Sequence, residues 1–174
     1  MGSIESEFEM IIRKETASDI EAITEVTIAA FRTLPISNHT EQFIINALRA
    51  ANALTISLVA EIDGRVVGHI AFSPVTISDG AVGWYGLGPL SVLPKYQKIG
   101  IGKSLINEGL SLLKNLGSQG CVLDPNYYKR LGFQNFPELV HEGIPQEVFL
   151  VLPFTKRIPR GMIVFHKGFL AKGY

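Results

Sequence analysis

A glycine-rich segment between an expected strand and an expected helix carries the clearest chemical signal in the chain: Gln97-Lys98-Ile99-Gly100-Ile101-Gly102. Two glycines let a backbone approach a ligand closely, and the first N–H groups of a helix have no acceptor within the helix. The segment therefore predicts an anion-binding turn. Lys98 and Lys103 flank it and can neutralise a phosphate or pyrophosphate, or can simply lie in solvent.

Two known phosphate motifs do not fit these residues. Gly102-Lys103-Ser104 ends like a Walker A loop, but the position five residues before Gly102 holds Gln97 where that motif requires glycine. Gly100 and Gly102 also begin a dinucleotide fingerprint, but Leu105 stands where the third glycine should be. A nucleoside triphosphate and a dinucleotide are both disfavoured as ligands.

The elements that precede this turn follow from hydrophobic periodicity and turn residues. A short strand at residues 11–14 leads to Ser18-Asp19-Ile20-Glu21, which predicts a capping box at the start of a helix that ends before Pro35. Thr40 is a candidate N-cap of a second helix. Asp63-Gly64 then predicts a tight hairpin between strands at residues 56–62 and 65–72.

The next strand and the helix after it enclose the turn. Glycines and a proline interrupt the strand expected over residues 82–92, and such interruptions are typical of a bulged or splayed strand. Leucines at helical spacing predict a helix over residues 103–116 with Gly117 as its stop. Strands at 120–123, 148–152 and 162–166 and a helical turn at 126–130 complete an α+β order with a mixed sheet.

Composition bounds the class of protein. The chain has 174 residues, 47% of them apolar and 18% charged, so we expect one domain over residues 10–174 after a leader or disordered extension at 1–9. Sixteen basic and sixteen acidic side chains argue against nucleic-acid or membrane partners. A single cysteine and four scattered histidines favour a cytoplasmic, metal-free protein, and no apolar run approaches the ~20 residues of a membrane span.

Two segments together resemble a known family. Residues 90–102, Leu-Ser-Val-Leu-Pro-Lys-Tyr-Gln-Lys-Ile-Gly-Ile-Gly, are similar to the acetyl-coenzyme A motif of the Gcn5-related N-acetyltransferases (GNAT), whose core is Gln or Arg, two residues, Gly, one residue, and Gly or Ala. Residues 127–133 are similar to the later aromatic segment of the same family, which ends in Gly-Phe. Residues 58–77 and 86–92 most resemble the YhbS-like branch, although Leu123 is followed directly by Asp124-Pro125 where that branch has a longer strand.

The resemblance implies a fold and a cofactor site. The fold is α+β (mixed α/β), with a central, mostly antiparallel twisted sheet, helices on both faces and a splayed strand pair that binds acetyl-CoA as co-substrate. Leu90 and Val92 would pair with the pantetheine arm, and the pyrophosphate would lie on the turn. The implied cofactor contacts are Leu90, Ser91, Val92, Gln97, Lys98, Ile99, Gly100, Ile101, Gly102, Lys103 and Ser104.

The family also implies a catalytic tyrosine, and the chemistry requires a base. Tyr128 aligns with the tyrosine that protonates the departing thiolate. Deprotonation of the amine needs a carboxylate or a water chain, and Glu41, at the start of the second helix, is favoured over Glu61. His69 alternates with apolar neighbours, which is typical of a packed or surface histidine. Cys121 lies in an apolar strand and is expected to be an inert buried thiol.

The predicted activity is transfer of an acetyl group from acetyl-CoA to a primary amine by direct attack in a ternary complex. The acceptor stays open among small amines, amino acids, peptide N-termini and protein lysines, since this scaffold serves many acceptors. A non-catalytic coenzyme A-binding or sensor domain of the same fold is the alternative. Exchange of the strand at residues 162–166 with a second subunit would give a homodimer.

Overall fold

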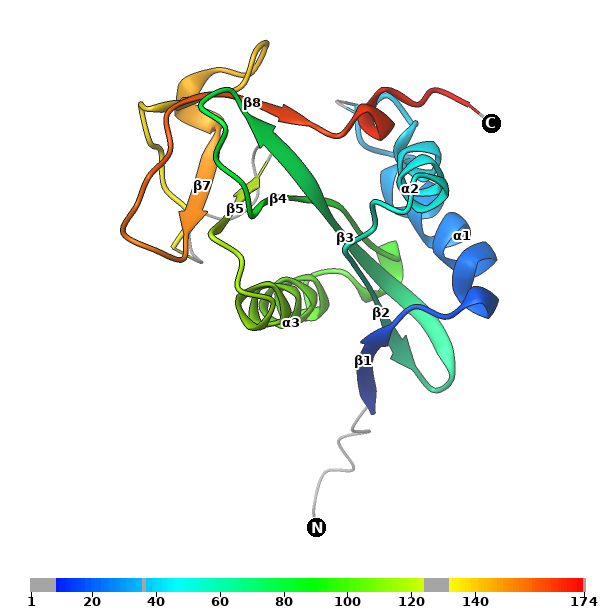
Figure 1. The fold of residues 1–174 in the computed structure, drawn as a ribbon. Helices are drawn as coiled ribbons and strands as arrows, with labels where there is room; N and C mark the ends of the chain where they lie inside the picture. The colour runs from blue at the N-terminus through cyan, green and yellow to red at the C-terminus, as the bar shows by residue number, and fades with distance from the viewer. Residues whose placement is uncertain (1–8, 36, 124–131, 174) are drawn as a thin grey trace.

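The computed structural model describes residues 9–35, 37–123 and 132–173 (Figure 1). Within these residues the chain forms a mixed α+β structure. The strands are β1 (Met10–Lys14), β2 (Ile56–Ile62), β3 (Arg65–Ile77), β4 (Trp84–Val92), β5 (Gly120–Leu123), β6 (Leu139–Val140), β7 (Leu150–Pro153) and β8 (Gly161–Phe165). The α-helices are α1 (Ile20–Phe31), α2 (Glu41–Ala50) and α3 (Ile101–Asn115).

The strands form one mostly antiparallel sheet in the order β1-β2-β3-β4-β5-β7. The pairs β4/β5 and β6/β8 are parallel, and the other pairs are antiparallel. β3 is long enough to pair with β2 over its first part and with β8 over its last three residues. This second pairing brings the C-terminal segment beside the middle of the sheet.

Helices cover both faces of the sheet, as Figure 1 shows with α3 on one side and α1 and α2 on the other. The face under α3 is the larger core, where Leu105 and Leu113 pack with Ile70 and Phe72 of β3. The face under α1 and α2 carries a smaller cluster that includes Ile23, Ile45 and Val59. Alternation along β2 and β3 explains this division, since successive side chains of a strand point to opposite faces.

The expected fold is confirmed, and one expected local motif is wrong. The first helix does begin after residue 18, but its capping box is not Ser18-Glu21. A 3-10 turn, η1 (Ala17–Asp19), precedes α1, and the capping residues are Thr16 and Asp19. The Asp19 carboxylate accepts a hydrogen bond from the Thr16 backbone N–H at 2.7 Å and also binds Arg13. Asp19 takes the capping position because it also forms an ion pair with Arg13 on β1, whereas Glu21 has no ion pair among the described residues.

Several boundaries also differ from the sequence expectations. β3 runs five residues past the predicted end at Phe72, because β8 offers it a partner there. α3 starts at Ile101, two residues earlier than predicted, and the strand predicted at residues 148–152 is β7, which begins two residues later than predicted. The short β6 was not expected at all. The helical turn predicted at residues 126–130 lies outside the described residues, and so does the extension predicted at residues 1–9, except for Glu9.

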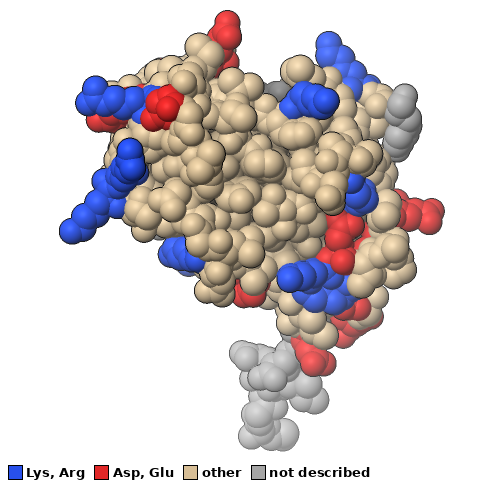
Figure 2. Space-filling model, in the orientation of Figure 1, with Lys and Arg blue, Asp and Glu red and all other residues tan. Residues whose placement is uncertain are grey.

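The strand predicted at residues 162–166 is β8, which pairs with two other segments of this chain. β8 lies between the end of β3 and β6, with Val75 opposite Phe165 and Leu139 opposite Gly161. Among the described residues, no helix is both long and apolar enough to cross a bilayer. On the face shown in Figure 2, lysine and arginine side chains are scattered around the rim, without a continuous basic patch among the residues described there.

Candidate active site

A large cleft of about 1580 Å³ opens where the sheet parts beside β4. One wall is β4 from Leu87 to Val92 together with the turn and first residues of α3. A second wall comes from the end of α1, the following loop and the start of α2. The third wall comes from His141 to Ile144 and from β8 and the residues after it. The three walls derive from segments far apart in the sequence, which the pairing of β8 with β3 brings together.

The splay of the sheet exposes backbone groups of β4. Among the described residues, β5 pairs with β4 only from Trp84 to Leu87, and the rest of β4 has a partner only on the β3 side. The N–H of Leu93, the next residue, donates to Val67 of β3 at 2.8 Å. Because backbone groups alternate along an antiparallel pair, those of Leu90 and Val92 point away from β3 and toward the cleft. An extended ligand can therefore pair with this strand.

A bulge shapes the same strand at the point where it leaves β5. The register between β3 and β4 shifts between Ile70 and Phe72, so that Leu90 faces Ile70 but Leu87 faces Phe72. The extra length is taken up at Gly88 and Pro89, which form a cis peptide and line the cleft. The bulge that the glycines and the proline of this strand predicted is thereby confirmed.

The first turn of α3 closes one end of the cleft with backbone donors. Gly100 is the N-cap residue with φ 94°, a left-handed conformation that glycine adopts without strain, and no side chain caps the helix. The first bond within the helix runs from the Ser104 N–H to the Gly100 carbonyl at 3.0 Å. The N–H groups of Ile101, Gly102 and Lys103 therefore have no acceptor within the helix, and such groups favour the binding of an anion.

The Gln97 side chain connects the turn to the strand. Its Nε2 donates to the Val92 carbonyl oxygen at 2.9 Å, which fixes the turn relative to the end of β4. Lys98 has a positive φ of 66°, so the chain reverses sharply between this bond and the helix. The Gln97 side chain therefore stabilises the turn, in addition to any contact that it makes with a ligand.

The structure brings most of the predicted cofactor contacts into the cleft. Its lining includes Leu90, Val92, Gln97, Lys98, Gly100, Ile101, Gly102 and Lys103. Three predicted residues do not line it: Ser91 is buried on the other face of β4, Ile99 is exposed outside the cleft, and Ser104 lies on the next turn of the helix.

Glu41 lines the opposite wall, across the cleft from these residues. Its Oε1 accepts a hydrogen bond from the Ser37 hydroxyl, and the Ser37 oxygen also accepts from the His39 N–H at 2.9 Å. Its Oε2 is buried and has no partner among the described residues. A buried carboxylate oxygen without a donor is costly, so this atom is available to a ligand or to water. Glu61, the weaker candidate base, is ion-paired with Arg13 at 3.1 Å and does not line the cleft.

Tyr128 lies outside the described residues. The sequence reasoning missed the aromatic side chains of the third wall, of which Phe165 and Phe169 are the largest. Their rings lie 5.0 Å apart, centroid to centroid, and His141 lies 5.1 Å from Phe165. The only available signal was the presence of aromatic residues in late segments, because their place depends on how β8 pairs.

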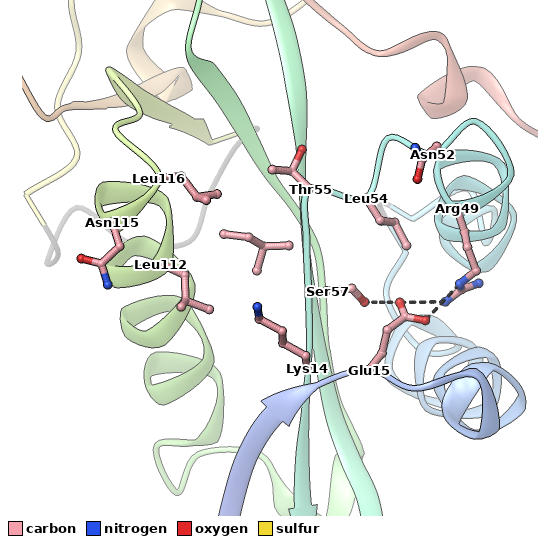
Figure 3. Close-up of a pocket in the computed structure, with 11 residues that line it drawn as sticks. Lys14, Glu15, Arg49, Asn52, Leu54, Thr55, Ser57, Leu112, Asn115 and Leu116 are labelled. Carbon is pink, nitrogen blue, oxygen red and sulfur yellow. Dashed lines mark hydrogen bonds and ion pairs between the residues drawn. The ribbon is translucent and has the colours of Figure 1, made fainter.

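A second, smaller cavity of about 420 Å³ lies at the edge of the sheet, between the ends of α2 and α3 (Figure 3). On its floor Arg49 binds the Glu15 carboxylate with Nε at 3.1 Å and with its second terminal nitrogen at 3.2 Å. The Ser57 hydroxyl donates to the same carboxylate. This polar chain leads inward from the cavity to a buried histidine.

His69 ends that chain under α1. Its Nε2 lies 2.8 Å from Ser57 Oγ, and because Ser57 gives its hydrogen to Glu15, His69 must donate from Nε2. Full burial, with a smaller contribution from the positive charge of Arg49, lowers the pKa of His69 to about 3. His69 is therefore neutral near pH 7, which agrees with the predicted packed histidine and not with a cationic role.

The remaining reactive groups also have structural explanations. Cys121 is fully buried on β5, and burial raises the pKa of its thiol far above the ordinary value. A thiol without thiolate character is a poor nucleophile, as expected from the sequence. The described residues contain no group of three His, Cys, Asp or Glu side chains that could hold a metal ion.

Known proteins match this chain over most of its length. The family model "Acetyltransferase (GNAT) domain" matches residues 54–135, which include β2 to β5 and the turn before α3. The chain is 35% identical over 128 residues to the uncharacterized N-acetyltransferase YhbS of Escherichia coli K12, an alignment that covers 72% of this chain and 74% of that protein.

Solved structures with the same fold contain acetyl-CoA or CoA. A GNAT family acetyltransferase from Brucella melitensis, solved in complex with acetyl-CoA, is 49% identical with a TM-score of 0.82, and the match covers 93% of this chain and 99% of that chain. The YhbS structure from Escherichia coli, solved in complex with CoA, is 27% identical with a TM-score of 0.86 over 99% of this chain and 98% of that chain.

Proposed function

The chain belongs to the GNAT family of acetyltransferases, in the YhbS branch, and from this premise we propose that it transfers an acetyl group from acetyl-CoA to a primary amine by direct attack in a ternary complex. One observation carries the proposal: the outward backbone of β4 and the open N–H groups of α3 line a single cleft. The first suits an extended amide-containing arm, and the second suits a pyrophosphate. Acetyl-CoA has both groups in series.

The cofactor would bind along this wall from one end to the other. The pantetheine arm pairs with the backbone of Leu90 and Val92, and the pyrophosphate lies on the amides of Ile101 to Lys103. Lys98 and Lys103, which both line the cleft, add positive charge at the same end. Ser91, Ile99 and Ser104, which do not line the cleft, belong to the strand, the turn and the helix that hold these contacts in place. Acetyl-CoA is consumed as a co-substrate, and the chemistry uses no metal ion.

The reaction balances without a covalent enzyme intermediate. The ammonium form of the acceptor first loses a proton, and the free amine attacks the thioester carbonyl carbon. The C–N bond forms, the nitrogen loses a second proton, the C–S bond breaks, and the thiolate of coenzyme A takes up a proton. The products are an N-acetyl amine, coenzyme A and one released proton. Holding both substrates in one cleft lowers the barrier through proximity and orientation, and a backbone amide of β4 polarises the carbonyl.

Two side chains would move the protons. Glu41 accepts the proton of the amine, directly or through water, because its Oε2 lies in the cleft wall and has no hydrogen-bond partner within the described part of the chain. Tyr128 donates the proton to the departing thiolate, a role that rests on its match to the family motif. The acceptor is a small amine or the amine of a peptide or protein, and the reaction takes place in the cytoplasm. A homodimer is compatible with this scheme but is not needed by it.

Release of free thiol in the presence of acetyl-CoA and a panel of primary amines tests the proposal. We expect thiol release that depends on both substrates, and a Tyr128→Phe variant that binds acetyl-CoA normally but turns over about 100-fold more slowly. Tight binding of acetyl-CoA without thiol release for any amine would contradict catalysis and favour the non-catalytic coenzyme A-binding domain.

A further inference from the structure

Three aromatic rings form a continuous wall on the acceptor side of the cleft. His141, Phe165 and Phe169 all line it, with ring centroids 5.1 Å apart for the first pair and 5.0 Å for the second. The ring planes are tilted by 53° in the first pair and by 49° in the second, so the rings are not stacked in parallel. We call these residues the aromatic wall. A surface of this kind binds flat apolar groups well.

The aromatic wall reaches from the splayed strand to the second helix. The ring of Phe165 packs directly on the backbone of Gly86 in β4, where a side chain would collide with it. Phe169 packs against the cluster that contains Ile44 and Leu48 of α2. The wall therefore begins next to the strand that would hold the thioester and ends one helical turn from Glu41.

Glu41 supplies a negative group at the end of this wall. Its Oε1 is held by Ser37, and its buried Oε2 has no donor among the described residues. A buried carboxylate oxygen is satisfied best by a charged donor such as an ammonium group. The other charged side chains that line this part of the cleft are Glu142 and Lys167. An acceptor with its own carboxylate beside the ammonium group would bring a second negative charge to the buried Glu41 oxygen, so an acidic acceptor is disfavoured.

We propose that the acceptor is a primary amine attached to an aromatic or large apolar group and without a carboxylate next to it. This inference rests on the proposed acetyl transfer. The ammonium group pairs with Glu41 Oε2 before it loses its proton, and the apolar group lies along the aromatic wall. An arylalkylamine and the N-terminus of a peptide with a first aromatic residue share this chemistry.

Four acceptors separate the contributions of the wall and of the charge. 2-Phenylethylamine carries both favourable features, ethanolamine lacks the ring, phenylalanine adds one carboxylate, and spermidine replaces the ring by further charges. We expect kcat/KM for 2-phenylethylamine to exceed each of the other three at least tenfold. A tripeptide amide that begins with phenylalanine distinguishes the two sources, because it is used well only if the cleft admits a continuing chain. Equal or better use of ethanolamine, phenylalanine or spermidine would overturn the proposal.

A variant of the aromatic wall tests which residues recognise the ring. Phe169→Leu keeps an apolar contact to α2 but loses the ring, so we expect the preference for 2-phenylethylamine over ethanolamine to fall about tenfold, through KM. Leu116→Ala removes an exposed apolar side chain outside the cleft and is the matched control. An equal loss for every acceptor in Phe169→Leu would contradict a role in recognition.

Calorimetry separates failure of this inference from failure of the transfer reaction. 2-Phenylethylamine is titrated into the protein saturated with coenzyme A, which cannot donate an acetyl group. Binding without turnover in the kinetic assay would support the acceptor site while contradicting acetyl transfer. No binding at millimolar concentrations would overturn the acceptor site, whatever the kinetics show with other amines.

Discussion

The ring of Phe165 on β8 packs against Gly86 on β4, although these two residues lie almost eighty positions apart in the chain. A Cβ atom at Gly86 would lie 2.7 Å from Cδ1 of the ring and closer still to Cε1, distances that real side chains do not adopt. The contact ties the C-terminal wall of the cleft to the central strand. It explains why this position holds glycine, although its neighbours in the strand are Tyr85 and Leu87.

We expect Gly86→Ala to destabilise the fold by about 2 kcal/mol through overpacking against Phe165. Urea unfolding of the wild type, both single variants and the Gly86→Ala/Phe165→Leu double variant measures the coupling. The cost of alanine should be smaller in the Phe165→Leu background, because the ring that it meets is gone. Strictly additive costs would contradict the contact.

Stability should depend on pH through His69. The folded protein keeps His69 neutral because burial holds its pKa near 3, whereas an unfolded histidine takes up a proton below about pH 6.5. The unfolded state therefore binds more protons between these values, and the free energy of unfolding falls as pH drops, by about 1.4 kcal/mol per pH unit. His69→Gln should remove this part of the slope, which unfolding curves at pH 7, 6, 5 and 4 would reveal.

His39→Asn, at an exposed histidine, is the control. Parallel curves for the wild type and His69→Gln would show that His69 does not carry the dependence.

The pair between Asp19 and Arg13 should stabilise the start of α1. Hydrogen bonds from Arg13 at 2.7 and 2.9 Å hold the pKa of the buried Asp19 well below its usual value. The ionised Asp19 therefore contributes its full stabilisation of the folded state above about pH 4, and this contribution is lost as the pH falls further. Asp19→Asn should cost roughly 2 kcal/mol at pH 7, and the difference from wild type should narrow in acid. Glu21→Gln, at an exposed acid in the same turn, should cost much less. A similar loss in both variants would contradict a specific role for Asp19.

Cys121 should not react in the folded protein. Its full burial and raised pKa leave almost no thiolate near pH 8. A disulfide reagent should therefore label the protein only at the rate of unfolding, and completely in denaturant. Rapid labelling of the native protein would show that β5 is far more accessible than its burial indicates.

Local signals predicted much of the core and the cofactor end of the cleft. The Asp63-Gly64 turn defined the hairpin of β2 and β3, the glycines and proline of β4 predicted its bulge, and the turn at residues 97–102 predicted the open start of α3. Each of these features depends on residues that are close in the sequence. Short-range patterns suffice for them because backbone conformation alone determines the result.

The acceptor side could not be predicted in the same way. The aromatic wall depends on the pairing of β8 with the end of β3, and β6, with only two residues, has too little periodicity to be detected. The capping box was assigned to Ser18 and Glu21 because the sequence pattern fits, while the ion pair from Arg13 on β1 decides in favour of Asp19. Both outcomes depend on contacts across the fold that no local window contains.

If acetyl-CoA lies on the first turn of α3, as proposed, its binding should be sensitive to the variant Gly102→Glu. A glutamate there favours the helix, because it replaces glycine and complements the helix dipole, but it puts a negative charge where the pyrophosphate should lie. Asn107→Glu, at an exposed position of the same helix outside the cleft, carries the same change of charge. By calorimetry we expect micromolar binding of acetyl-CoA to the wild type and to Asn107→Glu, and a loss of at least 100-fold in Gly102→Glu with its melting temperature unchanged or raised. Equal affinity in all three proteins would contradict this place for the cofactor.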